Sequence, residues 1–181
     1  DRDVALAKLR PLLEDPGVLK IGHNLKYDLI VLGRLGIDVA PFDDSIVMSF
    51  DLDAGLHGHG MDELAATHLS HSCIAYKDVV GTGKKQLGFH EVDLKAATRY
   101  AAEDADVTLR LWRRFRARLP AEGATRIYQM VDRPLVPVIA RMERRGIKVD
   151  RERLAQLSRG FDAEIAVLET TIHGLAGGSF T

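Results

Sequence analysis

The stretch that decides the fold of this chain is Arg99-Tyr-Ala-Ala-Glu-Asp-Ala-Asp-Val-Thr108, in a long segment of helical composition. Tyr100 and Asp104 are four residues apart. A helix has 3.6 residues per turn, so it places the two side chains one above the other on the same face. A hydroxyl and a carboxylate aimed at one point can position a water molecule and ligate a hard cation. The stretch therefore predicts a candidate catalytic face, although such pairs also occur often on ordinary surfaces.

A second acidic stretch, His23-Asn-Leu-Lys-Tyr-Asp28, adds weight to the first. Asp28 is expected in the first turn of a helix that follows a buried strand, near the place where open α/β sheets bind their ligands. A carboxylate there also complements the helix dipole, and taken alone Asp28 is better explained in that way. Asn24 fits two roles equally, a helix N-cap or a donor to a backbone phosphate or sugar.

The composition of the chain is that of an ordinary globular protein. It has 181 residues, of which 46% are hydrophobic and 28% charged, enough for one domain or for one truncated domain and part of another. No run of 18 apolar residues and no charged-then-apolar leader is present, so we expect no membrane span and no signal peptide. A single cysteine, Cys73, excludes an internal disulfide and a zinc site built on several thiolates, and it fits a reducing cytoplasm.

The charge balance does not identify a partner. The formal net charge is −1, so the overall basic signature of a nucleic-acid coat protein is missing. The basic residues form clusters, which a solvated helix face explains better than a phosphate-binding surface does. These clusters comprise Arg110, Arg113, Arg114, Arg116 and Arg118, and further on Arg141, Arg144 and Arg145.

Two short strands are expected among many helices. Residues 18–21 read as a buried strand, and residues 37–39 with 42–43 as a second strand with Pro41 at its edge. The pattern of apolar residues and caps predicts helices over about 4–14, 25–35, 45–52, 61–69, 93–118, 121–145 and 151–176. We expect Pro120 to stop the fifth of these, Pro134 and Pro137 to bend the sixth, and Asp150 to cap the last.

Two glycine-containing segments are expected to be loops, residues 53–60 and a mostly mobile loop over residues 76–89. A two-stranded sheet surrounded by helices is poorly stable alone. The simplest inference is that strands are missing upstream of Asp1 and that the chain is a fragment.

The two acidic stretches together resemble the second and third exonuclease motifs of the 3′–5′ proofreading domain of bacterial DNA polymerase I. The resemblance covers essentially the whole chain, in order and at family-like spacing. It extends through Pro11-Leu-Leu-Glu-Asp15, Met61-Asp-Glu-Leu-Ala65, Gly83-Lys-Lys-Gln-Leu87, Pro134-Leu-Val-Pro137 and Arg141-Met-Glu-Arg-Arg-Gly-Ile-Lys-Val-Asp150. A lone Tyr-x-x-x-Asp is a weak signal, whereas this collinear set is strong.

The resemblance implies an α/β fold of the ribonuclease H-like 3′–5′ exonuclease type, here N-terminally truncated. Such domains remove mismatched nucleotides from a DNA primer end with two divalent ions, Mg²⁺ or Mn²⁺, held by four carboxylates. By this resemblance Asp104 ligates the first metal, Tyr100 orients the attacking water, and Asp28 acts on the second metal. These three residues are the expected catalytic set, and the two aspartates are the expected metal ligands.

The resemblance also implies substrate-binding residues and a partner. Asn24 and His23 are expected near the terminal nucleotides of a single-stranded 3′ end. Tyr76 matches a position where an aromatic ring meets single-stranded DNA, and stacking there is chemically sensible because every base has a π-face. A partly buried structural tyrosine is an equally open interpretation of Tyr76. The expected parent is a monomeric cytoplasmic, nucleoid-associated enzyme that binds DNA and no membrane.

The first exonuclease motif of the family, an Asp-x-Glu on an early strand, is missing. The acids of the first 27 residues are Asp1, Asp3, Glu14 and Asp15, and none of them lies on an expected strand. Two metals cannot be held by two carboxylates alone, so we predict that this chain is inactive by itself. In residues 55–60, glycine or histidine replaces a basic residue expected to contact substrate, which weakens the expected affinity more than the chemistry.

The expected domains are a partial exonuclease domain over residues 1–119 and, over residues 120–181, an all-α start of the polymerase domain with a connector helix and a thumb helix. DNA-templated synthesis would belong to the parent, because no polymerase carboxylates can be assigned here.

A free-standing exonuclease of the ribonuclease D type is an alternative, and the polymerase-like sequence after Arg141 speaks against it. A non-catalytic DNA-binding or structural module is another, and the intact Asp28, Tyr100 and Asp104 speak against a decayed site.

Overall fold

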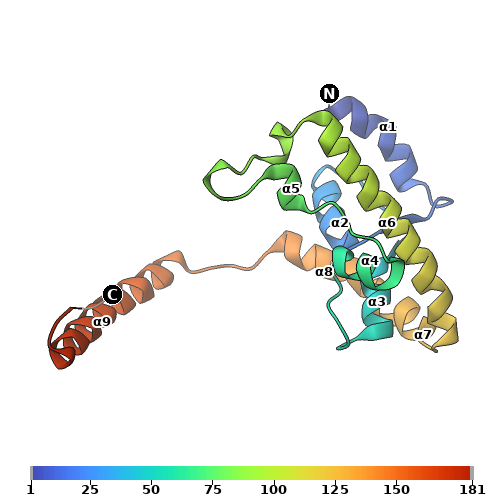
Figure 1. Cartoon of the computed structure of the whole chain (residues 1–181). Helices are drawn as coiled ribbons and strands as arrows, with labels where there is room; N and C mark the ends of the chain where they lie inside the picture. The colour runs from blue at the N-terminus through green and yellow to red at the C-terminus, as the bar shows by residue number, and fades with distance from the viewer. Residues whose placement is uncertain (1, 180–181) are drawn as a thin grey trace. The chain divides into compact units, whose positions relative to one another are not determined.

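The computed structural model describes residues 2–179, apart from the side chain of Lys85. The chain forms two compact units, Asp1–Arg144 and Arg145–Thr181, which Figure 1 shows together with the order of the elements. The helices of the first unit are α1 (Arg2–Glu14), α2 (Leu25–Arg34), α3 (Ser45–Asp53), α4 (Met61–Leu69), α5 (Tyr76–Val80), α6 (Leu94–Ala121), α7 (Thr125–Ile127) and α8 (Arg133–Arg145). Its strands are β1 (Lys20–Gly22) and β2 (Phe42–Asp44).

The sheet has two strands, as the sequence predicts, and they run parallel with Ile21 opposite Asp43. The predicted bounds are partly wrong. Strand β1 begins at Lys20, and residues 37–39 are not a strand. The amide of Ile37 instead bonds the carbonyl of Leu32 at the end of α2, 3.1 Å away, so it cannot join the sheet. Pairing of the second strand with β1 therefore begins only at Phe42.

The core of the first unit lies where α6 crosses α3 and α4. The buried residues of α6 are spaced by three and four positions and form one stripe: Val107, Thr108, Leu111, Trp112, Phe115 and Leu119. They pack with Met48 of α3, with Leu64 of α4 and with Tyr128. The buried side chains of α6 begin at Val107, so the part of the helix before it, drawn yellow-green in Figure 1, presents its side chains at or near the surface.

Residues 76–89 are more regular than the predicted mobile loop. They contain α5 and the single-turn 3-10 helix η1 (Gly83–Lys85), and η2 (Phe89–Glu91) follows. The amide of Leu87 donates to the carbonyl of Val80 over 2.8 Å, which closes the turn between them. Gly81 and Gly83 have φ values of 78° and 69°, a conformation that glycine adopts without steric cost, so the glycines here shape defined turns.

Two predicted helix boundaries are also wrong. Pro120 lies inside the last turn of α6, which continues to Ala121 before Gly123, with a φ of 76°, turns the chain. The predicted helix over residues 121–145 is divided into α7, the π-helical turn η3 (Tyr128–Asp132) and α8. The break precedes Pro134, which has no amide hydrogen to donate, so the regular helical ladder is interrupted there.

The second unit contains α9 (Arg151–Ala176). As predicted, Asp150 caps it: its carboxylate accepts a hydrogen bond of 2.9 Å from the amide of Arg153. Gly177, with a φ of 74°, ends it. The predicted apolar stripe is exposed, and none of the α9 side chains that the structure describes is buried. Within residues 2–179, every helix is too short or too polar to cross a membrane.

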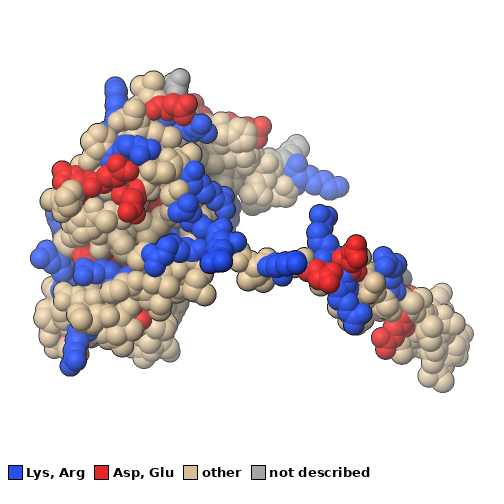
Figure 2. Space-filling model, turned by 180° about the vertical axis from the view of Figure 1, so that it is seen from behind, with Lys and Arg blue, Asp and Glu red and all other residues tan. Residues whose placement is uncertain are grey.

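Charges of both signs are mixed on the face of the first unit seen in Figure 2. Arg113, Arg114 and Arg116 are exposed, as a solvated helix face predicts. Arg118 differs, because both terminal nitrogens of its guanidinium bond the carboxylate of Asp53 at 2.7 and 2.8 Å.

Candidate active site

The candidate site is built on the first half of α6, where Tyr100 and Asp104 lie on adjacent turns. Asp93 starts this helix by accepting hydrogen bonds from the amides of Lys95 and Ala96. Both site side chains are half-buried, and each influences the pKa of the other. Burial and then the Asp104 charge raise the pKa of the Tyr100 hydroxyl, so it keeps its proton at neutral pH.

Excess negative charge surrounds Asp104. Burial raises the pKa of its carboxyl, the hydrogen bond from Tyr100 lowers it, and the carboxylates of Glu103 and Asp62 raise it again. Asp62 lies in the first turn of α4. A cation at this point would relieve the repulsion between these groups.

Glu103 is held quite differently from its neighbour Asp104. One of its carboxylate oxygens lies 3.0 Å from Nε2 of His71, and the other accepts a 2.6 Å hydrogen bond from the amide of Ile74. These contacts, the backbone bond first, lower the pKa of Glu103. Glu103 therefore fixes the segment after α4 against α6. Both of its carboxylate oxygens already have partners within the chain.

Three aromatic rings form one side of the candidate site. Tyr76, the first residue of α5, stacks on Phe89 with ring centres 6.2 Å apart, and each meets Tyr100 edge-on at 6.1 and 6.0 Å. Tyr76 is 47% exposed, which agrees with a partly buried tyrosine and also leaves part of its surface accessible to a base. The structure therefore brings the predicted stacking residue to the predicted water-orienting hydroxyl.

The other predicted residues gather at the turn between β1 and α2. The buried carboxylate of Asp44 accepts hydrogen bonds from the amides of Asn24 (3.0 Å) and Leu25 (2.8 Å), which fixes this turn. Asn24 has a φ of 60° and an exposed side chain, with no side-chain capping bond within the described chain. Nδ1 of His23 lies 2.9 Å from the Ser45 hydroxyl, and burial lowers the pKa of this imidazole.

Asp28 lies in the first turn of α2, as predicted, and its side chain is exposed. Burial by neighbouring groups nevertheless raises the pKa of its carboxyl. Helix α6 packs against β1, the strand that leads into α2. The largest electrostatic influences on Tyr100 and Asp104 come from residues other than Asp28.

Asp28 and Asp104 have the oxygen ligands that Mg²⁺ prefers, but two carboxylates alone would not complete a metal site. Two clusters of three close ligands occur among residues 2–179, and neither contains Asp28 or Asp104. The donor chemistry therefore fits a divalent ion, whereas the ligand set within this chain is incomplete. That agrees with the missing Asp-x-Glu motif.

Sequence reasoning missed three residues of this neighbourhood, Asp62, Phe89 and Asp44. Asp62 and Phe89 lie in other segments from Tyr100, and only the tertiary fold brings them to α6. Asp44 directly precedes a helix, a position that indicates an N-cap, and its carboxylate does accept a hydrogen bond from the amide of Ile46. Nothing in the neighbouring sequence indicates its two hydrogen bonds to the turn between β1 and α2.

A family model described as 3′–5′ exonuclease matches residues 1–120. The chain belongs to the 3′–5′ exonuclease family. It is 52% identical over 176 residues to DNA polymerase I of Rhizobium leguminosarum, an alignment that covers 97% of this chain and 17% of that protein. The chain thus spans about a fifth or less of the length of these curated relatives.

Two solved structures resemble this chain. Brucella melitensis NrnC with bound Mg²⁺ is 25% identical, with a TM-score of 0.63 over 79% of this chain and 67% of that one. The POL domain of Pol1 from M. smegmatis, in complex with DNA primer-template and dNTP, has a TM-score of 0.65 at 20% identity, over 97% of this chain and 27% of that one. The second likeness concerns the fold alone.

Proposed function

We propose that this chain is part of the proofreading 3′–5′ exonuclease of a DNA polymerase I and that residues 120–181 lead into the polymerase domain. The parent would remove mismatched nucleotides from DNA primer ends, carry out DNA-templated synthesis, and work as a monomer in the bacterial cytoplasm. The observation that carries the proposal is the Tyr100–Asp104 pair, with the exposed ring of Tyr76 directly beside Tyr100.

Each residue has a role that follows from its surroundings. The Tyr100 hydroxyl stays protonated and is oriented by Asp104, so it is suited to hold a water molecule by a hydrogen bond. Asp104 and Asp28 would each ligate a divalent ion, and the remaining carboxylates would come from outside this chain. Such ions would supply activation of the water and stabilisation of the leaving 3′ oxygen. The Mg²⁺ in NrnC supports this choice of metal.

The substrate would be a single-stranded 3′ end. The exposed ring of Tyr76 offers a base a flat surface, and its contact with Phe89 fixes the orientation of that surface. The exposed side-chain amide of Asn24 can bond a phosphate or sugar because Asp44 already holds its backbone. His23 is proposed to stabilise this turn through Ser45 and to lie near the terminal nucleotides.

The experiment that tests the proposal follows degradation of 3′-labelled single-stranded DNA with Mg²⁺. It compares this chain with an N-terminally extended form from the parent gene. The proposal expects digestion by the extended form and little or none by the chain alone. An extended form that binds DNA but does not digest it would instead support a non-catalytic module.

A further inference from the structure

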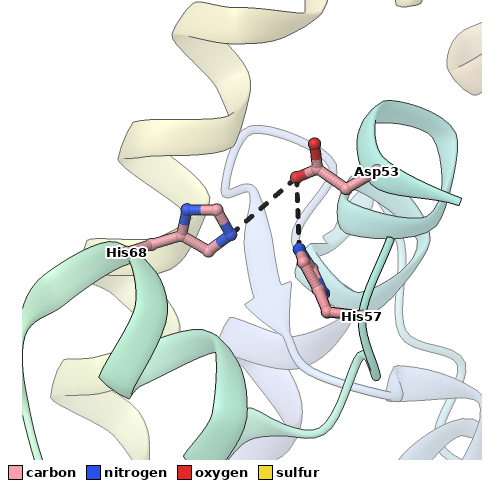
Figure 3. A group of neighbouring side chains, drawn as sticks. All are labelled: Asp53, His57 and His68. Carbon is pink, nitrogen blue, oxygen red and sulfur yellow. Dashed lines mark ion pairs between the residues drawn. The ribbon is translucent and has the colours of Figure 1, made fainter. Parts of the chain in front are cut away.

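Three side chains that the exonuclease proposal leaves unused point toward one another (Figure 3). Asp53 is the last residue of α3, His57 lies in the following loop, and His68 is in α4. Both imidazoles are aimed at one carboxylate oxygen of Asp53, with Nε2 of His57 3.7 Å and Nε2 of His68 3.8 Å from Oδ2. One ligand atom of each residue lies within 4.8 Å of the other two.

These separations suit ligands on either side of a metal ion. They are too long for hydrogen bonds between the three groups, which end near about 3.2 Å. In a tetrahedral site with bonds of roughly 2.0–2.1 Å, ligand atoms lie about 3.4 Å apart. The two distances to Asp53 exceed that value by a few tenths of an ångström, and the third separation is at most 4.8 Å, so an inward movement of the side chains would complete the geometry.

The orientation of His57 leaves a lone pair facing Asp53. Its Nδ1 lies 2.7 Å from the carbonyl oxygen of Gly58. A carbonyl can only accept, so Nδ1 carries the proton, and in the neutral ring Nε2 is an acceptor. Two acceptors that face each other repel unless a cation lies between them. A bond from the other ring nitrogen to a backbone carbonyl is also the usual arrangement of a metal-binding histidine.

His68 supplies an independent sign of a missing ligand. Its side chain is 10% exposed, and its ring packs edge-on against Phe115 with centres 5.0 Å apart. Nε2 is buried and has no hydrogen-bond partner in the part of the chain that the structure describes. A buried polar atom without a partner is costly, and each case in a native fold needs an explanation. A bound metal ion would satisfy this nitrogen.

Asp53 is fixed in position by Arg118. The guanidinium bonds both carboxylate oxygens, at 2.7 and 2.8 Å, and it also bonds Glu122 at 2.6 and 3.1 Å. A carboxylate oxygen has two lone pairs, so Oδ2 keeps one for a further ligand. Glu122 offsets the charge of Arg118, while Arg114 adds a nearby positive charge that would reduce the affinity for a cation.

We propose that Asp53, His57 and His68 form a binding site for a divalent first-row transition-metal ion of the Zn²⁺ class. Imidazole nitrogens suit Zn²⁺, whereas Mg²⁺ prefers oxygen ligands, so this site differs in metal from the exonuclease site. The bound ion links the loop of residues 54–60 to the ends of α3 and α4, with water as the fourth ligand. The inference does not depend on the proposed exonuclease function.

The second cluster of possible ligands, His71, Cys73 and Glu103, lacks these features. Glu103 is already bonded to His71 and to the amide of Ile74. Burial and neighbouring carboxylates raise the pKa of the Cys73 thiol to about 11, which disfavours the thiolate that binds metals. This cluster therefore provides a control.

Titration of the metal-free chain with Co²⁺ at pH 7.5, followed by displacement with Zn²⁺, tests the proposal. We expect one Co²⁺ per chain, with the visible absorption bands of tetrahedral cobalt, and a higher melting temperature with Zn²⁺. His57→Gln and His68→Gln should each weaken binding by more than about tenfold, whereas His71→Gln and the exposed control His90→Gln should not. His57→Cys should bind Co²⁺ and add a thiolate-to-cobalt absorption band.

Folding of each variant is checked by circular dichroism, and the wild type and His68→Gln are compared also in the longer parent polypeptide. The proposal is overturned if neither wild-type form, although folded, binds one more ion than the corresponding His68→Gln variant. A shared proton would then occupy the cluster. Binding that is lost in His71→Gln and kept in the His57 and His68 variants would also overturn it.

Discussion

The indole Nε1–H of Trp112 donates a 2.9 Å hydrogen bond to the buried carboxylate of Asp43, which joins α6 to β2. The other carboxylate oxygen accepts from the Tyr128 hydroxyl (2.9 Å) and from Arg133 (3.0 Å). One side chain of a two-stranded sheet thus satisfies donors from α6, η3 and α8. The helices around the sheet are held by polar bonds as well as by apolar packing.

Replacing Asp43 is therefore expected to be costly. Asp43→Ala leaves a buried indole N–H, a hydroxyl and a guanidinium without their acceptor. We expect the free energy of unfolding to fall by about 3–5 kcal/mol, the usual range when one partner of a buried charged network is removed. Urea denaturation followed by circular dichroism measures it. Asp38→Ala, at an exposed position, is the control and should change stability by less than about 0.5 kcal/mol.

The stability of the chain should depend on pH through Asp51. Burial and the neighbouring carboxyl of Asp132 raise the pKa of Asp51 to about 7, against about 3.9 in an unfolded chain. The folded state then binds the extra proton, so this contribution to stability is complete below about pH 4 and is lost as the pH rises through 7. One proton gives at most about 1.4 kcal/mol per pH unit, and the partial exposure of Asp51 reduces this value.

Urea denaturation at pH 5, 6, 7 and 8 tests this dependence. Asp132→Asn removes the neighbouring charge and should flatten the decline in stability between pH 5 and 8. Asp106→Asn, in an exposed pair with Arg110, should leave the slope as it is. Equal slopes in the wild type and Asp132→Asn would show that the pair does not carry the effect.

Tyr76 should contribute to binding of single-stranded DNA through its ring. In the N-terminally extended form, Tyr76→Leu should weaken binding by roughly 5- to 150-fold, because a stacked base contributes about 1–3 kcal/mol. Tyr76→Phe keeps the ring and should retain most of the affinity. Fluorescence anisotropy of a labelled oligonucleotide, with Ca²⁺ in place of Mg²⁺ to limit cleavage, measures both. Equal losses in the two variants would argue for a role of the hydroxyl.

The sequence predicts well what local spacing determines. Tyr100 and Asp104 share a helix face because they are four residues apart, and Asp150 caps α9 because it precedes an apolar stripe. Two short strands were also predicted, whereas their parallel pairing, the bounds of β1 and the irregular path of residues 37–39 were not. Residues 37–39 stay outside the sheet because the amide of Ile37 already bonds the end of α2.

Contacts between distant segments escaped prediction. Phe89 meets Tyr100, and His68 meets Asp53, only because helices from separate parts of the chain pack together. The histidines of residues 57–59 signalled a loop and an altered substrate contact, and their spacing from His68 matches no familiar metal motif. The π-helical turn before Pro134, whose Tyr128 packs into the core, was likewise not predicted.

The most direct test of the central claim is the Mg²⁺-dependent digestion of 3′-labelled single-stranded DNA by the N-terminally extended form and two matched variants. Asp104→Asn removes the carboxylate beside Tyr100, and Asp106→Asn changes an exposed aspartate two residues away on the same helix. We predict that Asp104→Asn lowers the rate at least about 100-fold while Asp106→Asn digests DNA like the wild type. Equal rates for all three forms would contradict the assignment of Asp104 to the catalytic site.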